Sequence, residues 1–206
     1  SDLPRKMTIF ECEGNAFIGT IRLCDAPDGI EHLKMSANLF SGRIHLNELP
    51  RRVQKLLLHS NSCNGTIDLT QLPATLQWLN LSQNRLEGTI DLTRLPFRMC
   101  ILNLSGNLFS GPVVLQRLPR GLRTLDLSEN RLTGDIALDH LPAVLHVLDL
   151  RANAFDGSVV IGDIPRIDTI DLSGNPLQPL AVLVDLPEKI WEDCSFDKIA
   201  RMRGEE

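Results

Sequence analysis

Aspartate recurs at one place in the second half of the chain, as Asp126, Asp149 and Asp171, at spacings of 23 and 22 residues. Carboxylates brought together can serve as a general acid and base, or can attract a basic partner. Catalysis by such a pair needs two different environments, whereas a repeated pattern gives every aspartate the same one. Two interpretations therefore stay open: hydrogen bonding to neighbouring serine and threonine side chains, or weak electrostatic steering of a partner.

The other reactive side chains do not assemble into a recognisable site. The sequence has five histidines and five cysteines, and no cysteine pair has the Cys-x-x-Cys spacing of a zinc or redox site. No phosphate-binding glycine loop and no Ser-His-Asp arrangement stands out. We therefore expect no catalytic residue, no metal and no cofactor, and the chain is not predicted to be an enzyme. Scattered cysteines in odd number favour reduced thiols and an intracellular location.

Composition narrows the class further. The net charge is −5, which gives no general attraction to nucleic acid, so we expect no nucleic-acid partner. No stretch approaches the roughly 20 apolar residues of a membrane span. Aromatic residues make up only 4% of the chain, so its core must be aliphatic and finely divided.

The elements that position these groups follow from an internal repeat of about 23 residues. Asparagine returns in one column, glycine follows it four residues later in seven of eight units, and a proline closes each unit. The asparagine column consists of Asn15, Asn38, Asn61, Asn84, Asn107, Asn130, Asn153 and Asn175. Columns that stay in register predict a stack of similar units, each contacting only its neighbours.

The best-formed unit, residues 76–98, predicts the path of the chain through one repeat. Leu79 and Leu81 alternate at period two, which indicates a short strand with inward leucines, stacked in one parallel sheet. The Asn84 amide both donates and accepts, so it can pair with buried backbone groups where the chain turns. Only seven residues separate Gly88 from the closing proline, too few for a full α-helix. We expect a short second strand or an extended segment there, followed by a tight 3-10-like turn into the Leu-Pro.

The wording Leu-Ser-x-Asn-x-Leu-x-Gly-Thr-Ile-Asp-Leu-Thr-x-Leu-Pro at residues 81–96 resembles the leucine-rich-repeat superfamily. The resemblance covers residues 2–189, and the wording is most similar to the 23-residue repeats of kinetoplastid leucine-rich-repeat proteins. It implies a leucine-rich-repeat solenoid, a horseshoe that is α/β by convention but mostly β. A parallel sheet then lines the concave side, and short strands with 3-10 turns form the convex side, without an outer ring of α-helices.

We predict one domain over residues 1–206. Residues 2–6 match the end of an incomplete repeat or an N-terminal cap, and residues 7–189 hold eight repeats. Residues 190–206 form a C-terminal cap and charged tail, in which Trp191, Cys194 and Phe196 close the core. The repeats start at Met7, Ile30, Val53, Leu76, Met99, Leu122, Leu145 and Ile167. Because solenoid ends need capping, the bare start favours a longer parent protein, and we expect a monomer.

Outward positions of the concave sheet are free of core packing, so departures from the repeat there mark candidate binding residues. Leu57, Trp78 and Ile101 are expected to form an apolar patch with a polar rim, a composition typical of an interaction hot spot. The alternative is that Trp78 only covers its neighbours. Arg131, Asp149 and Arg151 form a second, polar contact area. The whole candidate surface comprises Lys34, Lys55, Leu57, His59, Trp78, Asn80, Ile101, Asn103, Asp126, Arg131, Asp149 and Arg151.

The sequence therefore predicts a non-enzymatic scaffold that binds a protein partner through its concave face. A secreted or surface recognition module, or the repeat domain of a larger enzyme, are the alternatives. Glycosylation sequons begin at Asn64, Asn80 and Asn103. The last two fall in predicted concave strands, where glycans would block the binding surface, so they favour an unglycosylated, cytoplasmic protein.

Overall fold

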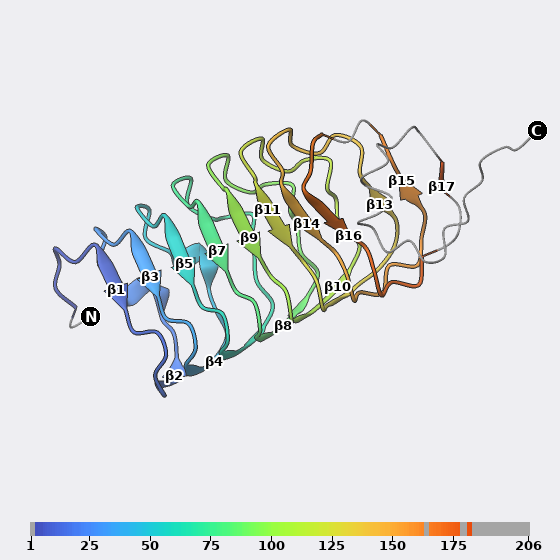
Figure 1. The fold of residues 1–206 in the computed structure, drawn as a ribbon. Coiled ribbons are helices and arrows are strands. Elements are labelled where there is room, and N and C mark those ends of the chain that lie inside the picture. Colours follow the sequence, from blue (N-terminus) through green and yellow to red (C-terminus); the bar gives the residue numbers. More distant parts are fainter. Residues whose placement is uncertain (1–2, 163–164, 178–180, 183–206) are drawn as a thin grey trace, which may run out of the picture.

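A computed structural model describes residues 3–162, 165–177 and 181–182 of the 206-residue chain. The predicted C-terminal cap, with Trp191, Cys194 and Phe196, lies outside the described residues, as does the end of the eighth repeat. The described part is a stack of coils in which every strand pairing is parallel (Figure 1).

Eight strands, one from each repeat, form the largest sheet, which we call the concave sheet. Each strand begins two residues after a predicted repeat start, as β7 does after Leu76, and the strands follow one another in sequence order. The strands are β1 (Ile9–Glu11), β3 (His32–Lys34), β5 (Lys55–Leu57), β7 (Trp78–Asn80), β9 (Ile101–Asn103), β11 (Thr124–Asp126), β14 (Val147–Asp149) and β16 (Thr169–Asp171).

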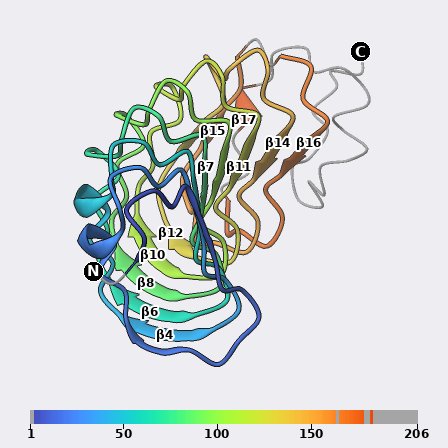
Figure 2. The ribbon, with the colours of Figure 1, turned by 90° about the vertical axis from the view of Figure 1, so that its left-hand side faces the viewer.

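A second sheet follows another side of the coil, as the view along the stack shows (Figure 2). Its strands are β2 (Ile18–Thr20), β4 (Leu39–Gly42), β6 (Ser62–Gly65), β8 (Arg85–Gly88), β10 (Leu108–Gly111) and β12 (Arg131–Leu132). A third, smaller sheet consists of β13 (Ile136–Ala137), β15 (Val159–Val160) and β17 (Ala181–Val182).

The position of the second strand changes along the stack. A short strand or extended segment was expected after the glycine of each unit, and β13 and β15 do follow Gly134 and Gly157, whereas in an earlier repeat β8 ends at Gly88. The glycine terminates the strand because its φ is +86°, in the left-handed region, and an added Cβ would meet Thr66 Cγ2 of the preceding repeat at 2.8 Å. The segment after Gly88 stays outside the second sheet, although Ile90 and Leu92 still point into the core and are buried.

The expected 3-10 turns occur, within the described residues, only as η1 (Leu23–Asp25) and η2 (Leu46–Glu48). In the next two repeats Asp68 and Asp91 occupy the place of the residue before the helix. Each accepts hydrogen bonds from the N–H and hydroxyl of the threonine two residues later, at 2.8 and 2.6 Å. These side-chain turns take the place of the 3-10 helix, in which the N–H groups of Glu48 and Leu49 donate to backbone carbonyls instead. They also lower the pKa of both aspartates.

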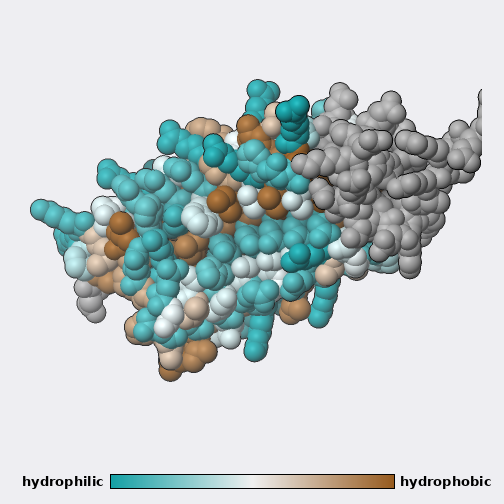
Figure 3. All heavy atoms as spheres, viewed as in Figure 1, coloured by the Kyte–Doolittle hydropathy of each residue, from teal (hydrophilic) through white to brown (hydrophobic). Residues whose placement is uncertain are grey.

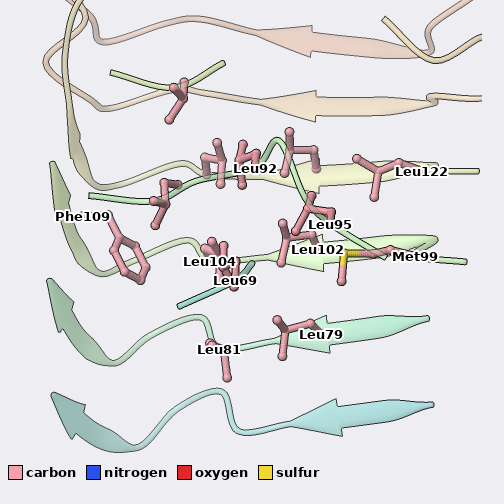
Figure 4. Packing of buried hydrophobic residues seen from close by; sticks show 14 of the residues in the cluster. Leu69, Leu79, Leu81, Leu92, Leu95, Met99, Leu102, Leu104, Phe109 and Leu122 are labelled. Carbon is pink, nitrogen blue, oxygen red and sulfur yellow. The ribbon is translucent and has the colours of Figure 1, made fainter. Parts of the chain in front are cut away.

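The core is a continuous column of aliphatic side chains between the sheets. Inward residues such as Leu79, Leu81, Leu102 and Leu104 are fully buried and stack repeat on repeat (Figure 4). Phe109 also lies in this column and is fully buried. Each buried leucine contributes roughly 1.5–3 kcal/mol, so the stack as a whole, rather than one large cluster, stabilises the fold.

The asparagine column joins each repeat to the one before it. Asn84 Nδ2 lies 3.1 Å from both the Leu81 and the Ser82 carbonyl of its own turn, and 3.0 Å from the Leu58 carbonyl of the preceding repeat. Its Oδ1 accepts the N–H of Cys63 at 3.0 Å. The prediction that the amide both donates and accepts is therefore confirmed. The same set recurs from Asn38 to Asn153, and only the first member, Asn15, is exposed and lacks the bonds to a preceding repeat.

The residue before each asparagine adopts a left-handed conformation in all eight repeats. The residue types alone do not predict this left-handed conformation, because only three of the eight residues are glycine. The φ values are +67°, +51°, +55°, +52°, +62°, +55°, +51° and +70° at Gly14, Ala37, Ser60, Gln83, Gly106, Glu129, Ala152 and Gly174. Five L-residues hold a disfavoured conformation, each at a cost of about 1–2 kcal/mol, which the asparagine bonds offset.

We expect Asn107→Asp to destabilise the protein strongly. Asn107 Nδ2 donates to the carbonyls of Leu81, Leu104 and Ser105, and an aspartate there would turn an oxygen towards them. A buried charge without a partner costs about 3–5 kcal/mol, measurable as a loss in the free energy of unfolding in urea.

The matched control is Asn15→Asp, the same change at the exposed first member of the column. It should cost about 0.5 kcal/mol or less. Equal losses in the two variants would contradict the role given to the asparagine ladder.

Candidate functional site

Two outward columns of the concave sheet carry most of the residues predicted to bind a partner. In the first, Lys55 pairs with Trp78, and Trp78 with Ile101. In the second, Lys34 pairs with Leu57, and the series then runs through polar side chains. Those polar residues are Asn80, Asn103, Asp126, Asp149 and Asp171. The surface on this side is mostly hydrophilic and interrupted by a few apolar side chains (Figure 3).

Trp78 lies at the centre of a hollow in the first column. The Lys55 ammonium sits 4.0 Å from the centre of the Trp78 ring, a cation–π contact. The hollow has a volume of about 260 Å³ and is lined by His32, Gln54, Lys55, Gln77, Trp78, Cys100 and Ile101. Lys55 was expected at the rim, and it lies over the ring instead. Trp78 and Ile101 are both half-buried, so the tryptophan still presents part of its surface to the hollow.

Leu57 does not belong to this exposed surface. Its exposure is only 9%, and Lys34 and Asn80 flank it in the paired strands. The predicted three-residue patch is therefore reduced at the surface to Trp78 and Ile101. His59 follows β5 and contacts the hydroxyl of Ser60, with Nδ1 and Oγ 3.5 Å apart.

Lys34 is already engaged within the sheet. Its ammonium forms a hydrogen-bonded ion pair with the Glu11 carboxylate of the adjacent strand. That bond lowers the pKa of Glu11 and raises the pKa of Lys34. The lysine charge is thus largely balanced before any partner arrives.

The Asn/Asp column is used to shape the turn that follows each strand. Asn80 Oδ1 accepts the N–H of Ser82 at 3.0 Å and its hydroxyl at 2.7 Å. Asp126 Oδ1 accepts the same two groups of Ser128, at 3.1 and 2.7 Å. Asn103 repeats the pattern and also donates from Nδ2 to Asp126 Oδ2 at 3.0 Å. The interpretation of this column as a hydrogen-bonding device is confirmed for these serines.

Arg151 replaces the serine in one repeat and partly neutralises the acidic end of the column. Its guanidinium lies 3.6 Å from Asp149 Oδ2 and 4.0 Å from Asp171 Oδ2. The pKa of Asp149 is nevertheless raised, because burial disfavours its charged form. The neighbouring carboxylates of Asp126 and Asp171 add to the increase, while the N–H and guanidinium of Arg151 oppose it.

Arg131 is not part of this face. It was predicted to join Asp149 and Arg151 in a polar contact area, but it lies in β12 of the second sheet, where it pairs with Ser110. The reason is its place directly after Asn130, where the chain has already left the concave strand.

No metal-binding geometry is present in the described part of the chain, where no group of three or more His, Cys, Asp or Glu side chains could hold an ion. Across the strand pair β3–β5, His32 lies beside Lys55 and not beside a second histidine. The four cysteines of the described residues are free, namely Cys12, Cys24, Cys63 and Cys100. Burial raises the pKa of the Cys63 thiol to about 11, so it is an inert core group.

A second hollow, which the sequence did not reveal, adjoins the first at the edge where the concave strands begin. It has a volume of about 470 Å³ and shares Gln77 and Cys100 with the Trp78 hollow. The remaining lining residues are Phe97, Arg98, Arg120, Gly121, Arg123 and Val144. The available signal was Gly121, which stands where other repeats carry Thr75, Arg98 or Val144.

No helix in the described residues has the length and apolar character needed to cross a membrane.

Comparison with known families identifies two of the repeats. The model described as Leucine Rich Repeat matches residues 75–94 and 121–140. Comparison with the curated proteins finds no match.

Solved structures share the architecture. The LRR ectodomain of the Arabidopsis receptor kinase HAESA, in complex with an IDA peptide hormone ligand, has 27% identity and a TM-score of 0.66, over 88% of this chain and 31% of that one. The PEPR1–AtPEP1 structure has 21% identity and a TM-score of 0.64, over 82% of this chain and 25% of that one. A plant ice-binding protein has 22% identity and a TM-score of 0.54, over 83% of this chain and 65% of that one.

This chain thus spans 31% of the HAESA chain, 25% of the PEPR1–AtPEP1 chain and 65% of the ice-binding protein. The fold is a leucine-rich-repeat solenoid without outer helices, and its matched repeats support the leucine-rich-repeat superfamily as the family of this chain.

Proposed function

We propose that this chain is a non-enzymatic protein-interaction scaffold that binds a protein partner through its concave face. The observation that carries the proposal is the Trp78 hollow, where the half-buried Trp78 and Ile101 present apolar surface on a sheet whose outward residues are mostly polar. A partly exposed tryptophan beside a cation is the composition of a binding hot spot. The HAESA ectodomain, of the same fold, is a complex with a peptide ligand, which supports an interaction role.

The non-enzymatic part of the proposal rests on how the acidic side chains are used. Asp126 and Asp149 both accept the N–H of the residue two positions later, so they serve the same local turn. A catalytic carboxylate pair needs an acid and a base in distinct settings.

The repeats are proposed to be of the kinetoplastid type and the protein to be intracellular, monomeric and without a nucleic-acid partner. Four free thiols suit a reducing compartment. The sequon residues Asn80 and Asn103 are half-buried and hydrogen-bonded in the concave sheet, which leaves little room for a glycan.

A surface recognition module is the second candidate, because the HAESA match is to a receptor ectodomain. Glycosylation of the exposed sequon residue Asn64 distinguishes a surface module from an intracellular protein. A glycosidase-sensitive mass at Asn64 in protein from the source cells would favour the surface module.

The role of Trp78 and Ile101 in partner binding is tested with the variant Trp78→Ala/Ile101→Ser. The variant and the native chain are compared by affinity capture from source cells, and then by titration of the purified partner. Loss of a hot-spot tryptophan costs at least about 2 kcal/mol, so we expect the Kd to rise about 30-fold or more. Leu57 is left unchanged because it is buried.

Val114→Ser/Val160→Ser is the control, since both valines are exposed and lie outside the concave sheet. This variant should bind as the native chain does. If the control loses the partner while the Trp78 variant retains it, another face carries the interaction.

A second prediction concerns the acidic column. Since the pKa of Asp149 is raised in the fold, its contribution to stability is present below the ordinary aspartate pKa and is lost as pH rises through the raised pKa. Asn80 and Asn103 show that asparagine suits this column. Asp149→Asn should therefore be more favourable, relative to native, at about pH 7 than at about pH 3 in urea unfolding.

Asp68→Asn should show the opposite dependence, because hydrogen bonds from Thr70 lower the pKa of Asp68. Its contribution is present above the ordinary pKa and is lost as pH falls, so that variant should be less favourable at about pH 7. The same pH dependence in both variants would refute the environments assigned to the two carboxylates.

A further inference from the structure

The second hollow concentrates positive charge in a chain whose net charge is −5. Arg98, Arg120 and Arg123 line it, and no aspartate or glutamate is among its described lining residues. None of the three guanidiniums lies within ion-pair distance of a carboxylate elsewhere in the described chain. Arginines grouped without counter-charges are suited to planar, bidentate binding of carboxylates.

Apolar surface accompanies this charge. Phe97 is 70% exposed and Val144 is 41% exposed, both unusually high for such side chains in this protein. The Arg98 guanidinium lies 5.5 Å from the centre of the Phe97 ring, so cation and aromatic surface belong to one feature. The hollow therefore fits a ligand that carries both acidic and apolar groups.

Gly121 opens the hollow. At the same place in an earlier repeat, the Thr75 hydroxyl donates to the carbonyls of Arg51 and Val53, each at 2.8 Å. A Cβ on Gly121 would lie 3.6 Å from the Phe97 carbonyl and 3.8 Å from the Met99 carbonyl, the equivalent positions. A threonine would thus fit at residue 121 without strain, and its absence leaves the floor of the hollow bare.

The two hollows form one continuous track, because they share Gln77 and Cys100. Between the starts of β7 and β14 the track crosses three strand intervals, roughly 15 Å at 4.8 Å each. An extended peptide rises about 3.3 Å per residue, so about five residues span that distance.

We propose that this track binds an extended acidic peptide segment of a partner protein. Its carboxylates engage Arg98, Arg120 and Arg123, and an apolar side chain rests against Phe97 and Val144. The proposal rests on the proposed scaffold function and adds the chemistry of the partner and a second subsite beside Trp78. Nucleic acid would also be attracted by arginines, but its continuous charge would extend over the carboxylates of Asp126, Asp149 and Asp171 at the ends of the strands, whereas a short acidic segment confined to the edge where the strands begin avoids them.

The test uses fluorescein-labelled peptides and fluorescence polarisation with the whole chain. The probes are Asp-Glu-Phe-Glu-Asp, its neutral isostere Asn-Gln-Phe-Gln-Asn, the basic Lys-Arg-Phe-Arg-Lys, and a single-stranded oligothymidylate. We expect the acidic peptide to bind most tightly, with an affinity that falls as salt rises.

Two variants examine the hollow by charge and by shape. Arg120→Gln/Arg123→Gln should weaken the acidic peptide about tenfold or more. Gly121→Thr should weaken it to a similar extent by covering the floor of the hollow, with unchanged net charge and the hydrogen bonds already seen at Thr75. Arg51→Gln/Arg52→Gln removes the same charge at exposed turn positions outside both hollows, Arg51 at the place of Arg120 and Arg52 at the place of Arg98, and should bind like the native chain.

Three results would overturn the proposal: equal binding of the neutral or basic peptide, tighter binding of the oligothymidylate, or equal acidic-peptide binding in the hollow variants and the control. Trp78→Ala is measured in parallel to separate this proposal from the scaffold function. If the neutral peptide binds as well as the acidic one and is lost in Trp78→Ala, the acidic preference fails while the concave-face scaffold stands.

Discussion

A primary amide can satisfy a backbone carbonyl and a backbone N–H at once, and in the interior repeats the asparagine amide does both where water has little access. Asn107 is 5% exposed, accepts the N–H of Leu86 and donates to three carbonyls, one of them in the preceding repeat. Leucine would remove all four of these bonds, whereas aspartate could keep only the bond from Leu86. The repeat length of the chain is therefore the spacing at which this asparagine recurs.

The ladder of amides explains why strands of only three residues suffice. Beyond β5, the backbone continues to pair through the turn, with the N–H groups of Leu58 and Ser60 donating to Asn80 and Ser82 of the next repeat. Neighbouring repeats are thus joined by backbone hydrogen bonds both along the strand and through the turn that follows it. Because the second outward column is occupied by side-chain turns to serine, the surface left for a partner is mainly the first column and the edge where the strands begin.

The sequence predicted the parallel sheet, the inward leucines and the asparagine contacts, because each depends on a residue type that recurs with the period. It placed the second strand after the glycine, where β13 and β15 lie, but it did not predict that strands of earlier repeats such as β8 end at the glycine, since period-two alternation also continues through Ile90 and Leu92. It placed Arg131 on the wrong sheet, because a column of residues does not show where the chain turns. The burial of Leu57 depends on the side chains beside it, Lys34 and Asn80, which no single repeat contains.

The acidic and basic features of the described surface differ in origin, and that difference bears on function. Asp126 and Asp149 occupy the same position of their repeats, and each accepts the N–H of the residue two positions later. The repeat itself therefore accounts for these aspartates. Arg98, Arg120 and Arg123 belong to different columns and line one hollow together with Gly121. In a solenoid, whatever recurs in every unit serves the stacking of the units. A cluster drawn from several columns has no such cause, and so a bound partner is the physical reason that best accounts for it.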